Sequence, residues 1–229
     1  MCGVIGAVIP DCSYDDLALL RKLFLESSIR GLHATGVAYV KRGQVLYFRE
    51  AIPANQFLEK YDLSDCIDQN GTLHLIGHCR YSTSDLEFNQ PMVSPDLALV
   101  HNGVVTQDPR NNWETMFDLV TLGGNDSELL LRGLVDKGKS PLELFPDASL
   151  AVVELHRDKT LRFYRNGLRP LYFANLPNSL GCVVASTADI LHRSGVDDVL
   201  PTTQNVCYTF EQEELTYTVY GTNKRDLQP

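Results

Sequence analysis

The chain has 229 residues, of which 44% are hydrophobic and 21% are charged, as in globular proteins that bury an ordinary core. The formal net charge is −9 without a run of Lys or Arg, so we expect neither nucleic acid nor a membrane as partner. We see no secretory signal after Met1 and no stretch as long as a membrane span. The six cysteines are scattered without a C-x-x-C pair, which favours a reducing, cytoplasmic compartment.

The first half of the chain predicts mostly strands. One clear helix is expected over residues 15–28, where leucines recur at helical spacing, with Ser13 or Asp15 as its cap and Gly31 as its stop. The segment 51–69 is weakly helical, and 82–95 is predicted as a loop. The predicted strands of this half cover residues 3–9, 36–40, 44–49, 72–81 and 97–101.

The second half predicts further hairpins and short helices. Helices are expected over 113–122, from about 127 to 138, and over 188–193. Many strands joined by hairpins, with few helices, favour antiparallel sheets with helices packed outside, an α+β layered fold. The predicted strands cover 149–156, 160–165, 171–174, 182–186, 206–211 and 215–220.

Cys2 is the first candidate for chemistry. Removal of Met1 would leave Cys2 with a thiol and a free α-amine on one residue. The amine has an ordinary pKa of about 7.7–8.0, so it can serve as a general base for the thiol near neutral pH. The alternative is a small hydrophobic residue that opens a buried strand.

Three further polar sites stand among apolar segments, and each also has an ordinary structural explanation. Arg80 could hold a carboxylate through two parallel hydrogen bonds, or simply reach solvent from a strand end. Asn102-Gly103 supplies the two donors of an oxyanion hole, but Asn-Gly is also a hairpin signal. Asp126 could hold an ammonium group, or cap the helix that follows it.

Four histidines raise the question of a metal site. Their spacings match no zinc pattern and each lies beside apolar strand residues, so we expect hydrogen-bonded core histidines and no metal. These four are His33, His74, His78 and His101.

Taken together, the polar sites have one consistent chemistry. Cys2 supplies a nucleophile and Asn102-Gly103 the donors for a tetrahedral oxyanion. Arg80 and Asp126 provide a cation and an anion for the charged ends of an α-amino acid whose side chain presents an amide. This describes hydrolysis of glutamine through a γ-glutamyl thioester, with release of ammonia.

The order of these motifs resembles the class II glutamine amidotransferase domain, an N-terminal-nucleophile (Ntn) hydrolase, and is most similar to the glutaminase domain of amidophosphoribosyltransferases. The resemblance covers residues 2–222, implies a four-layer αββα sandwich of two antiparallel sheets, and leaves 223–229 as a loose tail. The matching segments are Cys2-Gly3, Arg30-Gly31, Gly77-His78-Cys79-Arg80-Tyr81-Ser82-Thr83, His101-Asn102-Gly103, Asn125-Asp126-Ser127-Glu128 and Arg165-Asn166-Gly167-Leu168-Arg169-Pro170-Leu171.

The resemblance also implies roles for individual residues. Cys2 is the implied nucleophile, with Asn102 and Gly103 as the oxyanion hole. Arg80 would bind the glutamine carboxylate and Asp126 its ammonium group. The other implied substrate-site residues are Tyr81, Thr83, Arg30 and Gly31. No cofactor is implied.

Three positions depart from the family pattern. His33 and Asn166 stand where Asp is usual, and Ser84-Asp85 replaces a small residue or His followed by Gly. None of these changes removes a predicted catalytic group, but they affect the loop over the site. The sequence shows neither a P-loop nor a synthase domain, so we expect a stand-alone subunit that passes ammonia to a separate synthase.

Two other classes of function remain open. An Ntn amidase acting on another amide would share Cys2 and the fold, but would have no use for Arg80 and Asp126 as a paired clamp. A non-catalytic subunit that senses glutamine would have no need of Cys2, Asn102 and Gly103.

Overall fold

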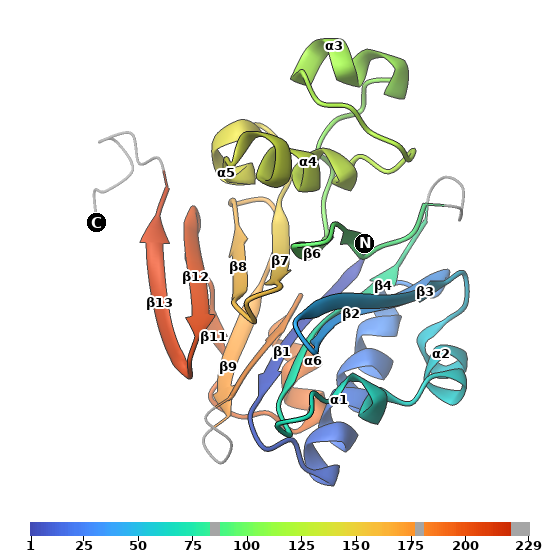
Figure 1. Ribbon diagram of the computed structural model, residues 1–229, viewed down its shortest axis with the longest axis vertical. Helices are drawn as coiled ribbons and strands as arrows, with labels where there is room; N and C mark the ends of the chain where they lie inside the picture. The colour runs from blue at the N-terminus through green and yellow to red at the C-terminus, as the bar shows by residue number, and fades with distance from the viewer. Residues whose placement is uncertain (83–87, 177–180, 221–229) are drawn as a thin grey trace.

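The computed structural model describes residues 1–82, 88–176 and 181–220. Two antiparallel sheets face each other, and helices cover the outer face of each sheet (Figure 1). The predicted α+β, four-layer αββα sandwich is therefore confirmed. Thr83 lies outside the described residues. So do the last residues of the expected domain 2–222 and the expected tail 223–229.

The first sheet has seven strands in the order β11-β9-β10-β1-β4-β2-β3. Strand β1 lies in its centre, antiparallel to β4 on one side and to β10 on the other. The strands are β1 (Gly3–Ile9), β2 (Ala34–Lys41), β3 (Gln44–Glu50), β4 (Leu73–Arg80), β9 (Tyr172–Leu176), β10 (Gly181–Ala185) and β11 (Leu200–Pro201).

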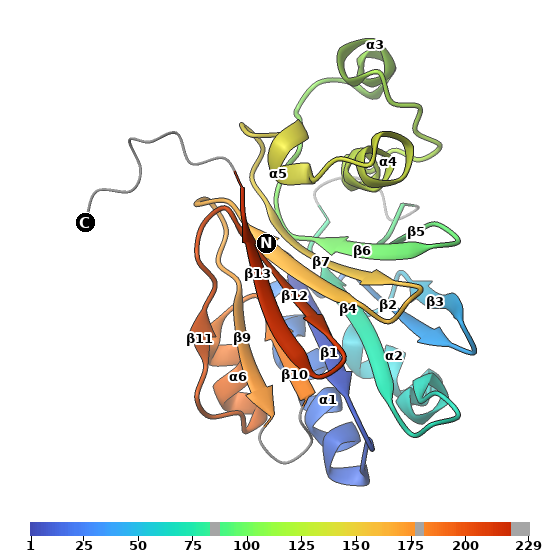
Figure 2. The same cartoon turned by 60° about the vertical axis from the view of Figure 1, so that its left-hand side comes forward.

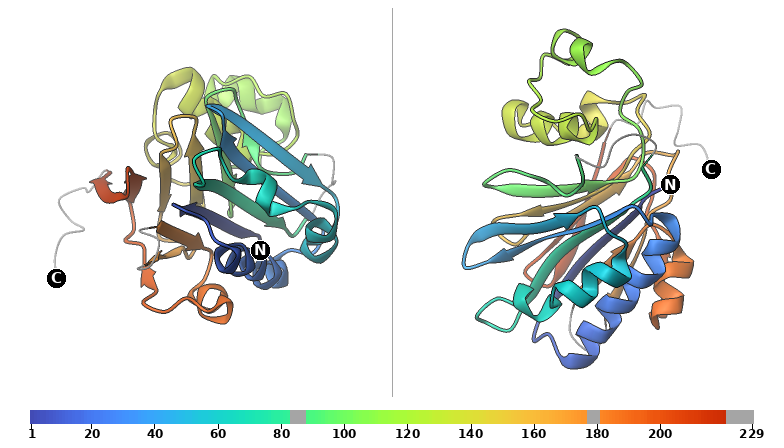
Figure 3. Two further views of the ribbon diagram at one scale, coloured as in Figure 1. Left: turned by 60° about the horizontal axis from the view of Figure 1, so that its bottom comes forward. Right: turned by 90° about the vertical axis from the view of Figure 1, so that its right-hand side faces the viewer.

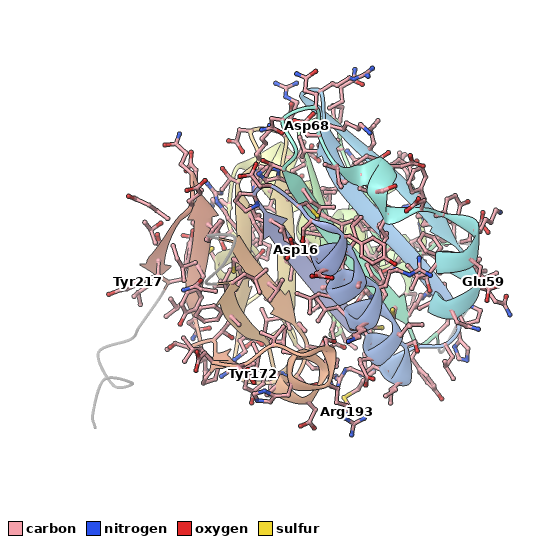
Figure 4. All side chains as sticks on the ribbon, turned by 90° about the horizontal axis from the view of Figure 1, so that it is seen from below. Asp16, Glu59, Asp68, Tyr172, Arg193 and Tyr217 are labelled. Carbon is pink, nitrogen blue, oxygen red and sulfur yellow. The ribbon has the colours of Figure 1, made fainter. Side chains whose placement is uncertain are left out.

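Three helices cover the outer face of this sheet: α1 (Tyr14–Ser27), α2 (Ala54–Lys60) and α6 (Ala188–Ser194) (Figure 2). Ser13 caps α1 as predicted, because its hydroxyl accepts from the Asp16 backbone while the Asp16 carboxylate accepts from the Ser13 backbone. Figure 4 shows α1 from below, across the sheet, with Asp16 near its beginning.

The second sheet has six strands in the order β13-β12-β8-β7-β6-β5. Helices α4 (Ser127–Lys137) and α5 (Pro141–Leu144) pack on its outer face, with α3 (Trp113–Phe117) beyond them (Figures 1 and 3). The strands are β5 (Met92–Val93), β6 (Leu97–His101), β7 (Ala151–His156), β8 (Leu161–Arg165), β12 (Val206–Glu211) and β13 (Glu214–Val219).

A core of aliphatic and aromatic side chains fills the space between the two sheets. Gly6 of β1 is required there, because a Cβ atom on it would lie 2.8 Å from the Val153 side chain of β7. None of the helices in the described ranges combines the length and the apolar character needed to cross a bilayer.

Two predictions, about the helix at 113–122 and the turn at Asn102-Gly103, were wrong. The helix expected over 113–122 ends at Phe117, because Asp118 takes the left-handed conformation with φ of 52°. Asn102-Gly103 makes no hairpin; Val104 still pairs with Ser149, and the chain then leaves the sheet and returns only after α5.

Candidate functional site

Cys2 lies at the beginning of the central strand β1 and is held by several elements at once. Its backbone nitrogen donates to Asn102 Oδ1 at 3.1 Å, and its carbonyl oxygen accepts from Arg30 Nε at 3.0 Å. Ser186 Oγ lies 3.5 Å from the same carbonyl and also accepts from the Val4 backbone. In Figure 1 the N-terminus lies at the end of β1 that faces α4. The position of this residue is therefore fixed from both sheets.

Accessibility separates the cysteines into two groups. Cys2 and Cys12 are partly exposed, and burial raises the pKa of Cys12 to about 11. The guanidinium of Arg30 donates to the Cys2 carbonyl, and burial lowers the pKa of Arg30. The other four thiols are buried and their pKa values are raised by burial: Cys66, Cys79, Cys182 and Cys207.

Asn102 follows β6 and is almost fully buried, with 2% of its surface exposed. Its Oδ1 accepts from Cys2, while its Nδ2 is buried without a hydrogen-bond partner among the described residues. An unsatisfied buried donor costs about 1–3 kcal/mol, so native proteins keep few of them and often for a purpose. The Asn102 amide therefore offers a donor beside Cys2 that no described residue uses, as an oxyanion hole requires.

Gly103 continues the same turn, and its backbone nitrogen donates no hydrogen bond to the residues that the structure describes. A Cβ atom at this position would lie 1.7 Å from the Ser149 carbonyl oxygen and 2.6 Å from His101 Nε2. Only glycine can occupy this position. The role of Asn102 and Gly103 as an oxyanion hole stays a prediction, with two donors in place for it.

His101 is fully buried beneath this turn. Its Nε2 lies 2.9 Å from the Ser149 carbonyl, which can only accept, so Nε2 carries the proton and Nδ1 accepts from Ser127 Oγ at 2.9 Å. Burial lowers the pKa of His101, so the imidazole is neutral. His101 is thus a fully bonded core histidine, as expected.

Two other histidines were expected to be fully bonded and are not. His78 Nε2 and His74 Nδ1 are buried without partners among the described residues. Burial lowers the pKa of His78 to about 3 and that of His74 to about 4, so both rings are neutral. No group of three His, Cys, Asp or Glu residues in the described ranges could hold a metal ion.

Arg80 ends β4 and is 8% exposed, so it does not simply reach solvent from a strand end. Its Nη1 donates to the Phe88 carbonyl at 2.9 Å and to Asn89 Oδ1 at 2.7 Å. These bonds hold the guanidinium close to the end of the sheet that carries Cys2. The proposed contact of Arg80 with a substrate carboxylate stays a prediction.

The segment 88–91 was predicted only as loop, yet it organises the site. The Gln90 side chain accepts from the His101 backbone nitrogen at 2.6 Å and donates to its carbonyl at 3.1 Å. Arg49 Nη1 donates to the carbonyls of Asn89 and Pro91. The neighbouring amides Asn89 and Gln90 were the only signal in the sequence for these bonds.

Asp126 does not cap α4 with its side chain, so that part of the expectation was wrong. Its Oδ2 accepts from the backbone of Val105 at 2.6 Å and of Thr106 at 3.4 Å, and so fixes the turn after Gly103. The preceding Asn125 donates to the Phe88 carbonyl, which Arg80 also binds. Arg80 and Asn125, the residue before Asp126, thus share one carbonyl. The role of Arg80 and Asp126 as a clamp stays a prediction.

The other predicted residues surround Cys2. Tyr81 is 52% exposed and its ring lies 4.9 Å from that of His33, which accepts from the Ser82 backbone at 2.9 Å. Gly31 is extended, with φ of −160°, and does not stop α1, which ends at Ser27. It is needed because a Cβ atom would lie 2.3 Å from the Cys79 carbonyl. Asn166, a second departure, has a structural role at Ala148 and Leu150. The third departure, Ser84-Asp85, lies outside the described residues.

No family model matches the chain, and no curated protein matches it. Solved structures do match its fold. Glutamine phosphoribosylpyrophosphate amidotransferase from B. subtilis superposes with a TM-score of 0.77 at 18% identity, over 97% of this chain and 50% of that one. An allosteric regulatory enzyme of purine biosynthesis gives 0.73 at 17% identity, again over 97% and 50%.

A third structure, a glutamine aminotransferase class-II domain protein from Silicibacter pomeroyi, gives a TM-score of 0.62 at 13% identity and covers 97% of this chain and 100% of that one. The chain spans about half the length of the first two proteins. At these identities the comparison concerns the fold. The resemblance found in the sequence is therefore confirmed at that level: this chain has the fold of class II glutamine amidotransferase domains.

Proposed function

We propose that the protein is a cytoplasmic glutamine amidotransferase subunit that hydrolyses glutamine to glutamate and ammonia at Cys2 and passes the ammonia to a separate synthase. One observation carries the proposal: Asn102 holds the backbone nitrogen of Cys2 with Oδ1 and leaves its buried Nδ2 without a partner among the described residues. The fold and the six unpaired cysteines support it, the latter because unpaired thiols persist in a reducing compartment.

The proposed reaction begins after Met1 is removed. The α-amine of Cys2 takes the thiol proton, and Sγ attacks the amide carbon of glutamine, so that an S–C bond forms and the oxygen becomes an oxyanion. Asn102 Nδ2 and the Gly103 backbone nitrogen donate to that oxyanion. The C–N bond then breaks, ammonia leaves with the proton from the α-ammonium, and water hydrolyses the thioester to glutamate.

The function is tested by removing, one at a time, the two charges proposed to bind the ends of glutamine. Arg80→Gln and Asp126→Asn should each raise KM for glutamine about 10–100-fold, because each removes a charged hydrogen bond of about 1.5–3 kcal/mol. The measurement is steady-state release of glutamate. Arg157→Gln and Asp96→Asn are matched controls, since these residues form an exposed ion pair with each other.

The two alternatives give different results in the same assay. If the protein is an amidase for another amide, Arg80→Gln and Asp126→Asn should hydrolyse that amide as fast as the wild type does. A glutamine sensor would bind glutamine, and Arg80→Gln would weaken that binding, but neither protein would release glutamate. Either result would contradict the proposed function.

Exposed apolar side chains around Cys2 support a covering partner. Each is next in sequence to a residue of the site or its supports, and large exposed apolar side chains near a site are typical of a surface that a partner covers. We call these residues the apolar rim. They are Ile29, Leu32, Tyr81 and Val104, between 38% and 68% exposed.

Leu32→Ser should therefore weaken the coupling to the synthase without changing turnover by the isolated subunit. We expect glutamine turnover to rise when extract of the source cells is added to the wild type, and to rise less with Leu32→Ser. Tyr217→Ser is the control, since Tyr217 is 70% exposed on β13 at the edge of the second sheet (Figure 4). Fast turnover that no extract fraction alters would exclude the coupling.

A further inference from the structure

A cavity of about 260 Å³ adjoins the segment 88–91, which holds Arg80. Its walls come from β3, from α4 and from Phe88 and Asn89. This volume lies just below the range of about 300–1,000 Å³ for drug-sized ligands and suits a small metabolite. The apolar part of the wall includes Phe88, Met92 and Leu131.

Two arginines line this cavity. Arg49 forms no ion pair with any described residue, and its Nη1 is fixed by the carbonyls of Asn89 and Pro91. The guanidinium of Arg49 is thereby held in place and lies over the Tyr47 ring, 5.1 Å from its centre. Its Nε and Nη2 donate to none of the described residues. A fixed guanidinium loses little freedom when it binds an oxyanion.

Arg132 is the second cation, and it is only partly neutralised. Its Nη2 lies 3.6 Å from Glu128 Oε1, while both oxygens of Glu128 already accept from the backbone of Leu122 and Gly123. Its Nε is buried without a partner among the described residues. Two guanidiniums and one occupied carboxylate leave an excess of positive charge in the cavity.

We propose that this cavity binds a small organic anion, whose phosphate or carboxylate group lies between Arg49 and Arg132 and whose apolar part contacts Phe88 and Met92. The cavity also adjoins the atoms that position Arg80, since Phe88 O and Asn89 Oδ1 accept from Arg80. A bound anion would hold β3, α4 and the segment 88–91 together and so favour the glutamine-binding position of Arg80. Only this coupling rests on the proposed function.

Thermal unfolding of the full chain tests the binding. Inorganic phosphate and acetate are added in separate titrations, and chloride at the same ionic strength is the reference. We expect one of them to raise Tm by about 2–4 °C, as a ligand does that binds only the folded state. Phosphate alone would indicate a phosphorylated ligand, and acetate alone a carboxylate.

The variants decide whether the effect belongs to this cavity. Arg132→Gln should abolish the rise in Tm, Arg132→Lys should retain part of it, and Arg49→Gln should also lose it. Arg193→Gln is the matched control because Arg193 is exposed on α6, on the face seen in Figure 4. An equal rise in Arg132→Gln and the wild type, or no rise with either anion, would overturn the proposal.

The coupling is read from KM for glutamine. The anion that raises Tm should lower KM at least about twofold in the wild type and leave KM unchanged in Arg132→Gln. If the enzyme is active and the anion raises Tm but leaves KM unchanged, the coupling is refuted and the proposed binding site stands. A rise in Tm in a protein that releases no glutamate would contradict the proposed function and leave the site intact.

Discussion

Replacing Cys2 by alanine is expected to lower glutamine hydrolysis by at least about 10⁴-fold, because the nucleophile of a covalent mechanism has no substitute. The folded state should be little affected, since Cys2 is only partly buried and its backbone makes its main contacts. The measurement is glutamate release, followed together with the thermal unfolding curve. Loss of activity with an unchanged curve assigns the effect to the thiol.

Cys12 provides the matched control, as the other partly exposed cysteine. Cys12→Ala should keep full activity. A diazo-ketone analogue of glutamine should label the wild type and Cys12→Ala once each, on an N-terminal peptide that lacks Met1, and should leave Cys2→Ala unlabelled. Glutamate release by Cys2→Ala at the wild-type rate would eliminate Cys2 as the nucleophile.

Asn102→Ala is expected to have the second largest effect, a fall in kcat of about 10²–10³-fold with a smaller change in KM. One oxyanion-hole donor is worth about 2.7–4 kcal/mol in the transition state. The substitution also removes the acceptor for the Cys2 backbone nitrogen. Asn102→Asp separates these effects, because it keeps the acceptor at Oδ1 and replaces the Nδ2 donor by a carboxylate oxygen.

Both variants at position 102 should therefore lose kcat, while Asn70→Ala in the loop before β4 should not. Single-turnover kinetics with glutamine would show slow formation of the thioester in Asn102→Asp. If Asn102→Asp were as active as the wild type, Nδ2 could not be a donor to the oxyanion. The unpartnered amide would then need another explanation.

Regular elements were predictable from the sequence where local pattern decides them. The bounds of β1 and β6 match the expected strands 3–9 and 97–101, since each apolar run stops at a polar or turn-forming residue. The Ser13 cap was predictable for the same reason, because its partners lie within three residues of it. These features follow from short segments alone.

The supports of the site depend on contacts between distant segments and were not predictable in this way. Asp126 at a helix beginning looks like a cap, but its carboxylate binds backbone nitrogens about 20 residues earlier. Gly31 after a helix looks like a stop, but the close approach of β4 explains it. The bonds of Gln90 to His101 likewise exist only once β5 and β6 are paired.

The order in which the ribosome makes this chain has a consequence for the central strand. Strand β1 is the first to be synthesised, but one of its two neighbours is β10, so Ile5 pairs with Ala185. The nascent chain must extend beyond residue 186 before Ser186 can bind the Cys2 carbonyl. Until then the beginning of β1 lacks its β10 neighbour, so the proposed removal of Met1 would act on an incompletely paired strand. The same delay keeps an unfinished chain from assembling the site around Cys2.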